Sequence, residues 1–285
     1  MTLPSPGAAV EAVRDASAAE LRSAYRRQRR KRDWFNFALL KHRHCDGFMA
    51  SMHQSGTHWL KHMLAVAIAA RYGLPPPQFI HSDDIIGGPR DRPPPPPAPN
   101  IRSTHSIAHP WVASSVTRGL LGLPRYVVLV RDIRASLVSN YEKWKARYEC
   151  EFDEFLYADP TAKRFNSDLW WCLRFCNAWG EVARRQPAHT LVVRYEDLQA
   201  DPLTHLQRVS TFLELDLSDA LLQQGVADSS KEKMQDKQDK QSLTVVRHDS
   251  RPVSAWFDAP ARSFVQRASR ELLRHDFGYD YSRWD

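Results

Sequence analysis

Short apolar runs alternate along the chain with longer segments of helical periodicity. The clearest run is Tyr126–Val130, a continuous β-branched stretch of the type that buried parallel strands use. The other predicted strands are Gly47–Ser51, Asn100–His105 and Thr190–Arg194. Helices are predicted over Thr57–Tyr72, Trp111–Leu121, Ala135–Tyr148, Ser167–Arg185, Pro202–Leu213, Leu217–Gly225 and Pro260–His275. This alternation predicts an α/β fold, a single domain whose central parallel sheet is flanked by helices.

The N-terminal part of the chain has a different character. Residues 10–44 follow a helical pattern in which the basic run RRQRRKR at Arg26–Arg32 precedes the apolar sequence WFNFALL. We therefore divide the chain into a basic helical extension, residues 1–44, and the α/β domain, residues 45–285. The basic run has two interpretations: a solvated helix face, or a basic amphipathic helix that rests on an anionic membrane.

Two segments lack a periodic pattern. Residues 78–100 include GGPRDRPPPPPAPN, which can form only extended or irregular chain and acts either as a connector or as a lid over a pocket. The polar stretch SSKEKMQDKQDKQ, residues 229–241, is predicted to be a mobile loop.

The composition of the chain narrows the classes of molecule that it is expected to bind. The chain has 285 residues, 40 basic against 33 acidic side chains and a net charge of +7, which favours an anionic ligand or surface. The basic run is not interleaved with stacking aromatics in a nucleic-acid-binding module, so we expect no nucleic acid.

The four cysteines are too scattered for a disulfide framework, and Cys172 and Cys176 are predicted to be buried thiols. No apolar run is long enough to span a membrane or to form a signal peptide, which predicts a cytoplasmic protein, peripheral at a membrane if the second interpretation holds. The oligomeric state stays open.

The turn at His53–Gly56 joins a predicted strand to a predicted helix. The unpaired N–H groups of Gly56, Thr57 and His58 would point in one direction there, and the helix dipole adds positive charge. Such a turn is a phosphate seat. The lysine and second glycine of the common nucleotide loop are missing, which argues against an ordinary ATP or GTP site.

Other candidate residues end neighbouring strands of the same predicted sheet. Ser103–His105, Arg131 and Tyr195 all lie at predicted carboxyl ends of strands, as His53–Thr57 does. Ligands of parallel sheets collect at the carboxyl ends of the strands, so we expect these residues to meet.

Four motifs in order resemble one family. SGTHW, RSTH, RDIRASLVSNY and RYEDLQADP, at these separations, are similar to the motifs of sulfotransferases that use 3′-phosphoadenosine 5′-phosphosulfate (PAPS). The similarity extends from about Gly47 to Tyr281. It implies a sulfotransferase fold like that of P-loop nucleotide hydrolases, with PAPS as co-substrate.

The resemblance also implies roles for single residues. It makes Ser55, Gly56, Thr57 and His58 the seat of the 5′-phosphosulfate and His105 the catalytic histidine. The other implied nucleotide contacts are Trp59 and Tyr195 at the adenine, Arg131 and Ser139 at the 3′-phosphate, Ser229 at the adenosine, and Arg251, or alternatively Arg247, at the 3′-phosphate.

The sequence departs from the family at two positions. Gln54 stands where the family has a catalytic lysine that assists the leaving phosphate oxygen, and Gln can donate a hydrogen bond but supplies no charge. The candidates to replace that charge are Lys61, His53, His58 and an arginine from a mobile loop. Ser230 stands where an adenine-packing phenylalanine is common.

The chemistry of transfer fits these residues. Sulfuryl transfer in line depends on positioning and charge stabilisation, with a base for the acceptor hydroxyl. His105 is the best candidate base, because an imidazole titrates near neutral pH and this one ends a strand. His53, His58, His81 and His109 are its rivals. For Arg131, an ordinary ion pair with Asp132 or Glu142 is the alternative to binding phosphate.

We therefore expect a sulfotransferase that moves the sulfuryl group of PAPS to a hydroxyl, or secondarily an amine, of a small-molecule or lipid-linked acceptor, and that requires no metal. Two alternatives stay open: a binding protein that kept the nucleotide pocket but lost turnover, and a P-loop-type phosphotransferase.

Overall fold

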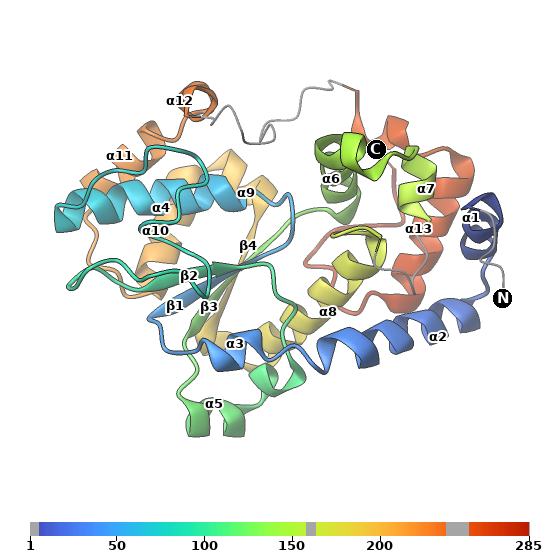
Figure 1. The fold of residues 1–285 in the computed structure, drawn as a ribbon, viewed down its shortest axis with the longest axis horizontal. Helices are drawn as coiled ribbons and strands as arrows, with labels where there is room; N and C mark the ends of the chain where they lie inside the picture. The colour runs from blue at the N-terminus through green and yellow to red at the C-terminus, as the bar shows by residue number, and fades with distance from the viewer. Residues whose placement is uncertain (1–5, 158–163, 238–250, 285) are drawn as a thin grey trace.

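A four-stranded sheet runs through the centre of the molecule (Figure 1). The computed structural model describes residues 6–157, 164–237 and 251–284. Its strands β1 (Gly47–Ser51), β2 (Ile101–Thr104), β3 (Arg125–Val130) and β4 (Thr190–Arg194) lie in the order β2-β1-β3-β4. Every neighbouring pair is parallel. The four predicted strands and the α/β class are thereby confirmed.

Successive residues of the strands face two different cores, because side chains alternate across a sheet. Phe48 and Ala50 of β1 pack into one apolar cluster and Met49 into the other. The cluster around Met49 is covered by α4 (Thr57–Tyr72), α10 (Pro202–Phe212) and α11 (Asp219–Ala227).

The opposite face carries the larger core. It is built from α6 (Ile133–Tyr148), α8 (Leu169–Arg185) and α13 (Ala259–Leu272), with the short helix α7 (Phe152–Leu156) at its margin. Figure 1 shows these helices grouped on one side of the sheet and α4, α10 and α11 on the other. The side chains of Trp170, Phe175 and Trp179 on α8 are buried here, as structural aromatics.

The N-terminal pattern is not one helix. It forms α1 (Pro6–Arg14), α2 (Ala18–Gln28), a π-helical turn η1 (Arg29–Asp33) and α3 (Ala38–Lys41). A capping box between Ser17 and Glu20 starts α2 afresh. The carboxylate of Asp33, the last residue of η1, forms a buried ion pair with Arg174 of α8.

The apolar face of α2 is used inside the molecule. Leu21, Ala24 and Tyr25 are buried in the larger core, and α2 packs against α13. This helix therefore has no apolar face left to lie on a membrane. The domain boundary at residue 44 stays a prediction.

Three other predicted segments differ from the structure. Trp111–Leu121 is broken into the 3₁₀ turn η2 (Pro110–Ala113) and α5 (Ser115–Leu121), because Ser114 is extended and caps α5 with its hydroxyl. The predicted loop 229–241 contains the short helix α12 (Lys231–Asp236), and residues 238–241 lie outside the described residues. The helix predicted to reach His275 ends at Leu272.

Two further short elements were not predicted. The helix α9 (Tyr195–Ala200) follows β4 at once, and the 3₁₀ turn η4 (Val253–Trp256) packs against α6. A third 3₁₀ turn, η3 (Pro187–His189), leads into β4.

The chain before the proline run lies along the edge of the sheet. Gly87 bridges to Arg102 of β2, and its carbonyl accepts a hydrogen bond from the Ser103 N–H (2.8 Å). The Arg102 guanidinium donates to the carbonyl oxygens of Gly88 and Asp91. This segment covers an edge strand whose backbone would otherwise be open to pairing.

Candidate active site

The turn after β1 is anchored to β3. The Met52 N–H donates to the Leu129 carbonyl (2.9 Å), and the buried Ser55 hydroxyl donates to the Met52 carbonyl (2.6 Å). Gly56 has φ +84°, and a Cβ at this position would lie 2.6 Å from a ring carbon of Tyr195. Glycine is therefore required both by the left-handed backbone and by the tyrosine ring packed on it.

Polar atoms around this turn are buried without a partner. The Thr57 hydroxyl, the His58 Nδ1 and the Arg131 Nε have no hydrogen bond among the described residues. Buried polar groups in native proteins are nearly always paired, so unpaired ones call for a ligand or water. Thr57 and His58 are the first two residues of α4, and Arg131 is bonded to the Gln54 carbonyl just before them. Unpaired donors at the start of a helix are the features of an anion site.

Arg131 reaches the turn from the end of β3. Its Nη1 donates to the Gln54 carbonyl (2.8 Å), and its guanidinium lies 4.5 Å from the centre of the Tyr195 ring. No ion pair with Asp132 or Glu142 is found within the described chain; Asp132 pairs instead with Arg134. The strand-end residues predicted to meet are thus brought together from β1, β3 and β4.

His105 follows β2 and leans back on β1. Its Nδ1 lies 2.8 Å from the Ser51 carbonyl oxygen, which can only accept a hydrogen bond, so Nδ1 carries the proton. A neutral imidazole in this tautomer keeps the lone pair on Nε2. The ring stacks on that of His53 at 4.0 Å, and His53 in turn packs on Trp171 at 4.7 Å.

The imidazoles of the site are held neutral. Burial lowers the pKa of His105, and burial lowers the pKa of His53 to about 2 and that of His58 to about 3. Nearby positive charges act in the same direction on all three. No carboxylate in the described parts of the chain lies close enough to raise any of these pKa values. The imidazoles of the site therefore feel basic groups and no acidic group among the described residues.

Trp59 and Ser229 are in direct contact. The Trp59 indole N–H donates to the Ser229 carbonyl oxygen (2.8 Å), and the Ser229 hydroxyl donates to the Gly225 carbonyl (2.7 Å). The His62 Nδ1 lies 2.7 Å from the same hydroxyl. The interaction between α4 and the end of α11 places both predicted adenosine contacts beside the turn.

The remaining predicted contacts lie on or near α6. Ser139 is half-buried on that helix. The Arg251 guanidinium lies 3.7 Å from the centre of the Trp256 ring, and Trp256 packs on Tyr141 of α6 at 5.8 Å. Arg247, the alternative to Arg251, lies outside the described residues.

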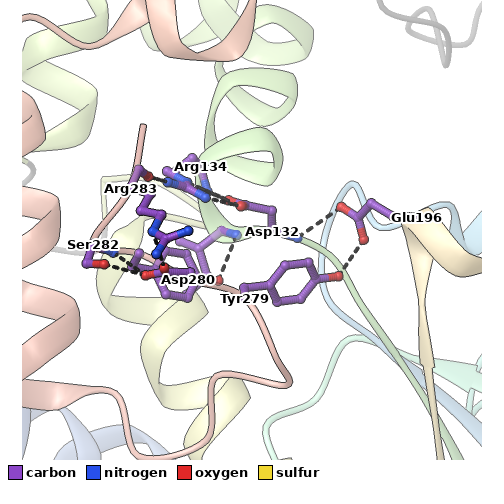
Figure 2. Close-up of polar contacts among 9 residues, drawn as sticks. Asp132, Arg134, Glu196, Tyr279, Asp280, Ser282 and Arg283 are labelled. Atoms are coloured by element: carbon purple, nitrogen blue, oxygen red, sulfur yellow. Dashed lines mark hydrogen bonds and ion pairs between the residues drawn. The ribbon is translucent and has the colours of Figure 1, made fainter. Parts of the chain in front are cut away.

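A second polar network at the strand ends was missed by the sequence analysis. We call Asp132, Arg134, Glu196, Tyr279 and Tyr281 the C-terminal clasp (Figure 2). Arg134 pairs with Asp132 (2.6 Å) and donates to a C-terminal carbonyl. Glu196 accepts from the Asp132 N–H and the Tyr279 hydroxyl, and the Tyr281 hydroxyl accepts from the Ile133 N–H (3.2 Å). The clasp fixes the start of α6 and of α9, next to Arg131 and Tyr195.

Lys61, a candidate to replace the missing charge at Gln54, already has an acidic partner. Its side chain is buried and forms an ion pair with Asp83, so it is not a free cation for the turn.

Other site types find little support in the described ranges. No group of three or more histidine, cysteine or acidic side chains is arranged to hold a metal there. Cys172 and Cys176 are buried free thiols, as predicted, and burial raises the pKa of Cys176 to about 12. None of the described helices has the length and apolarity to cross a bilayer.

Comparison with known proteins relates the sequence and the fold of this chain to one family. A family model described as "Sulfotransferase domain" matches residues 89–258. The fold is similar to that of mouse sulfotransferase SULT7A1 complexed with PAP, with a TM-score of 0.53 and 16% identity over 85% of this chain and 91% of that one. It is also similar to retinol dehydratase in complex with retinol and PAP, with a TM-score of 0.54 and 18% identity over 87% and 88% of the two chains. A search of curated protein sequences gave no match. At such identities the two structures establish the fold alone.

Proposed function

The chain belongs to the sulfotransferase domain family, and from this premise we propose that it transfers the sulfuryl group of PAPS to a hydroxyl group of its acceptor. Both similar structures carry PAP, which is PAPS without its sulfuryl group. The same nucleotide, an anion with phosphate groups at two positions, suits the basic groups of this site.

The observation that supports the proposal best is the grouping of unpaired donors at the turn. The N–H groups that begin α4, the Thr57 hydroxyl and the Arg131 Nε have no hydrogen-bond partner among the described residues, and Arg131 is bonded to the turn itself at the Gln54 carbonyl. We assign the 5′-phosphosulfate to Ser55, Gly56, Thr57 and His58. We assign the 3′-phosphate to Arg131, Ser139 and Arg251, and the adenine to Trp59, Tyr195 and Ser229.

His105 is the proposed base. Its Nε2 keeps a lone pair at neutral pH, because Nδ1 is committed to the Ser51 carbonyl and burial lowers the pKa. It takes the acceptor proton as the acceptor oxygen attacks sulfur. Gln54 contributes a side-chain donor but no charge at the transfer site.

The acceptor is a small molecule or a lipid-linked hydroxyl. Solved relatives in complex with retinol and with androsterone carry hydroxylated, largely apolar molecules. Aromatic surfaces near His105, such as Trp171 packed on His53, suit an acceptor of this kind.

Calorimetry with adenosine 3′,5′-bisphosphate (PAP), together with transfer of label from ³⁵S-PAPS to a panel of phenols and sterols, tests this function. We expect micromolar or tighter nucleotide binding and transfer to at least one hydroxyl. Binding without transfer would favour the silent binding protein. Magnesium-dependent ATP binding in place of PAP binding would favour the phosphotransferase.

A second proposal concerns peripheral membrane contact. Trp34, Phe35, Phe37 and Trp111 are exposed by 47%, 76%, 43% and 52%, and the Phe37 and Trp111 rings lie 5.9 Å apart. We call these four residues the aromatic platform. Exposed basic side chains lie close to the platform along the sequence, at Arg26, Arg27, Arg30, Lys31 and Lys41. Aromatic side chains bordered by basic ones suit the interface of an anionic bilayer.

From the sequence, a basic amphipathic helix was the candidate for membrane contact. In the structure the apolar face of α2 is buried against α13, so the contact proposed here is made by the aromatic platform instead. Flotation with vesicles of phosphatidylcholine and 30% phosphatidylserine tests it. We expect the Phe35→Ser variant to lose most vesicle binding. Phe79→Ser, which alters an aromatic exposed to the same degree as Phe37 (43%) but outside the platform, serves as the control. Equal recovery of all three proteins rules the contact out.

A further inference from the structure

The transfer site needs a cation that none of the residues considered so far provides. Lys61 is paired with Asp83. Arg131 is bound to the Gln54 carbonyl and lies over the Tyr195 ring. Gln54 itself is uncharged. A transfer in which negative charge develops on a leaving phosphate oxygen is strongly assisted by a fixed positive charge beside it.

Lys143 is placed by helix periodicity on the face of α6 that contacts the turn. Ser136 on this face donates its hydroxyl hydrogen bond to the His53 carbonyl (2.6 Å). Lys143 follows seven residues later, which is two helical turns or about 10 Å along the axis. Helical side chains point back toward the N-terminus of their helix, so the long lysine side chain is directed back toward His53.

The charge of Lys143 is felt at every imidazole of the site. After burial, it contributes to the lowered pKa of His53, of His58 and of His105, and no other lysine or arginine acts on all three. The three rings come from the turn, from α4 and from the end of β2. These rings include one in the phosphosulfate seat and the proposed base, so the charge of Lys143 acts on both parts of the site.

Lys143 has no acidic partner. In the described ranges it makes no hydrogen bond or ion pair, and its recorded neighbour is the ring of Trp144, 5.6 Å from Nζ. Burial alone lowers its pKa. A half-buried ammonium group without a counterion is a binding group for an anion.

We propose that Lys143 is a catalytic residue that holds its ammonium group against the transferring sulfuryl group and the phosphate oxygen it leaves, a role that rests on the proposed function. The acceptor oxygen forms its bond to sulfur while the bond between sulfur and the phosphate oxygen breaks. The electron pair of that bond stays on the phosphate oxygen beside Lys143, and the acceptor proton passes to Nε2 of His105.

The first test needs no acceptor. Lys143→Gln is compared with Lys145→Gln, an exposed lysine of the same helix, for binding of PAP and of adenosine 3′-monophosphate, which lacks the 5′-phosphate. We expect Lys143→Gln to weaken PAP binding about tenfold, the scale of a charged hydrogen bond, and to leave adenosine 3′-monophosphate unchanged. Equal affinities in wild type and variant, or an equal loss for both nucleotides, overturn the proposal. Absence of PAP binding by the wild type would instead remove the proposed function.

The second test locates the charge. Titration of the histidine resonances by NMR should show a higher pKa for His105 in Lys143→Gln than in wild type or Lys145→Gln, because a neighbouring cation disfavours protonation. An unchanged titration means that Lys143 lies elsewhere. This result is independent of whether the protein binds PAPS.

The third test concerns turnover, with 4-nitrophenol as probe acceptor. Lys143→Gln should lower kcat by 10²-fold or more, the scale of losing one transition-state donor, with the acceptor KM little changed. Lys143→Arg should retain part of the rate, and Gln54→Lys should restore part of it to Lys143→Gln. A rise in acceptor KM at constant kcat would assign Lys143 to acceptor binding and overturn the catalytic role.

Discussion

The carboxyl end of the sheet carries two groups of polar side chains that differ in how their charges are satisfied. In the C-terminal clasp, Arg134 faces Asp132, and Glu196 accepts two hydrogen bonds. At the turn a few residues away, Thr57 and Arg131 keep buried polar atoms without partners.

This difference separates a group that holds the fold from a group that holds a ligand. Paired charges do not destabilise the folded protein when no ligand is bound, because each has its partner within the chain. Unpaired buried donors lower the stability of the folded protein until an anion binds to them. Breaking the clasp should therefore lower stability, and breaking the turn should lower binding or turnover.

The largest effect is expected from His105→Ala. Loss of the base should lower kcat by about 10²- to 10⁴-fold and leave PAP affinity within about twofold, because the imidazole acts on the acceptor. Transfer from ³⁵S-PAPS and calorimetry measure the two quantities. The exposed His44→Ala is the control. A retained rate would place the base on another histidine.

Arg131→Ala should weaken PAP binding by about 2 to 3 kcal/mol, since a charged hydrogen-bond donor to phosphate is lost. Calorimetry measures it, with Arg92→Ala, an exposed arginine outside the site, as the matched control. An unchanged PAP affinity would mean that Arg131 has only a structural role, as a hydrogen-bond donor to the Gln54 carbonyl.

Arg134→Met tests the clasp. Removing the guanidinium leaves the largely buried Asp132 carboxylate without its ion pair, and the free energy of unfolding should fall by about 1 to 3 kcal/mol. Urea denaturation measures this change, and Arg71→Met, from an exposed pair with Asp216, should change stability by less than about 1 kcal/mol. A variant as stable as wild type contradicts the assignment of the clasp to the fold.

Tyr281→Phe is a smaller perturbation of the same clasp. The Ile133 N–H at the start of α6 loses its acceptor, and we expect a loss of about 0.5 to 1.5 kcal/mol. The same denaturation experiment detects it. A loss of PAP affinity without a loss of stability would show that the clasp and the turn are not separable.

The last prediction concerns pH. The folded-state pKa values of His53, His58 and His105 lie below the usual value near 6.5, so the unfolded chain binds more protons as pH falls. Stability should be constant above pH 7 and fall below about 6.5, by about 1 kcal/mol per imidazole at pH 6. The rate should stay high to a lower pH than an ordinary histidine base allows. A rate that halves near pH 6.5 would exclude a base with a lowered pKa.

The sequence alone determined the elements around the site. The run Gly47–Ser51 and the periodic segment Thr57–Tyr72 were predicted with the bounds the structure has, because a short apolar run and a 3.6-residue period have only one local solution each. The meeting of the turn, Arg131 and Tyr195 also followed from the sequence, since the strands that carry them are parallel.

Only the tertiary structure decided which polar groups are paired. Nothing local in the sequence indicates that Asp83 pairs with Lys61, that Asp33 pairs with Arg174, or that Lys143 has no ion pair in the described parts of the chain. Helical and strand periods are properties of neighbouring residues, whereas the partner of a charge depends on segments far apart in the chain, such as those of Asp33 and Arg174, being folded against each other.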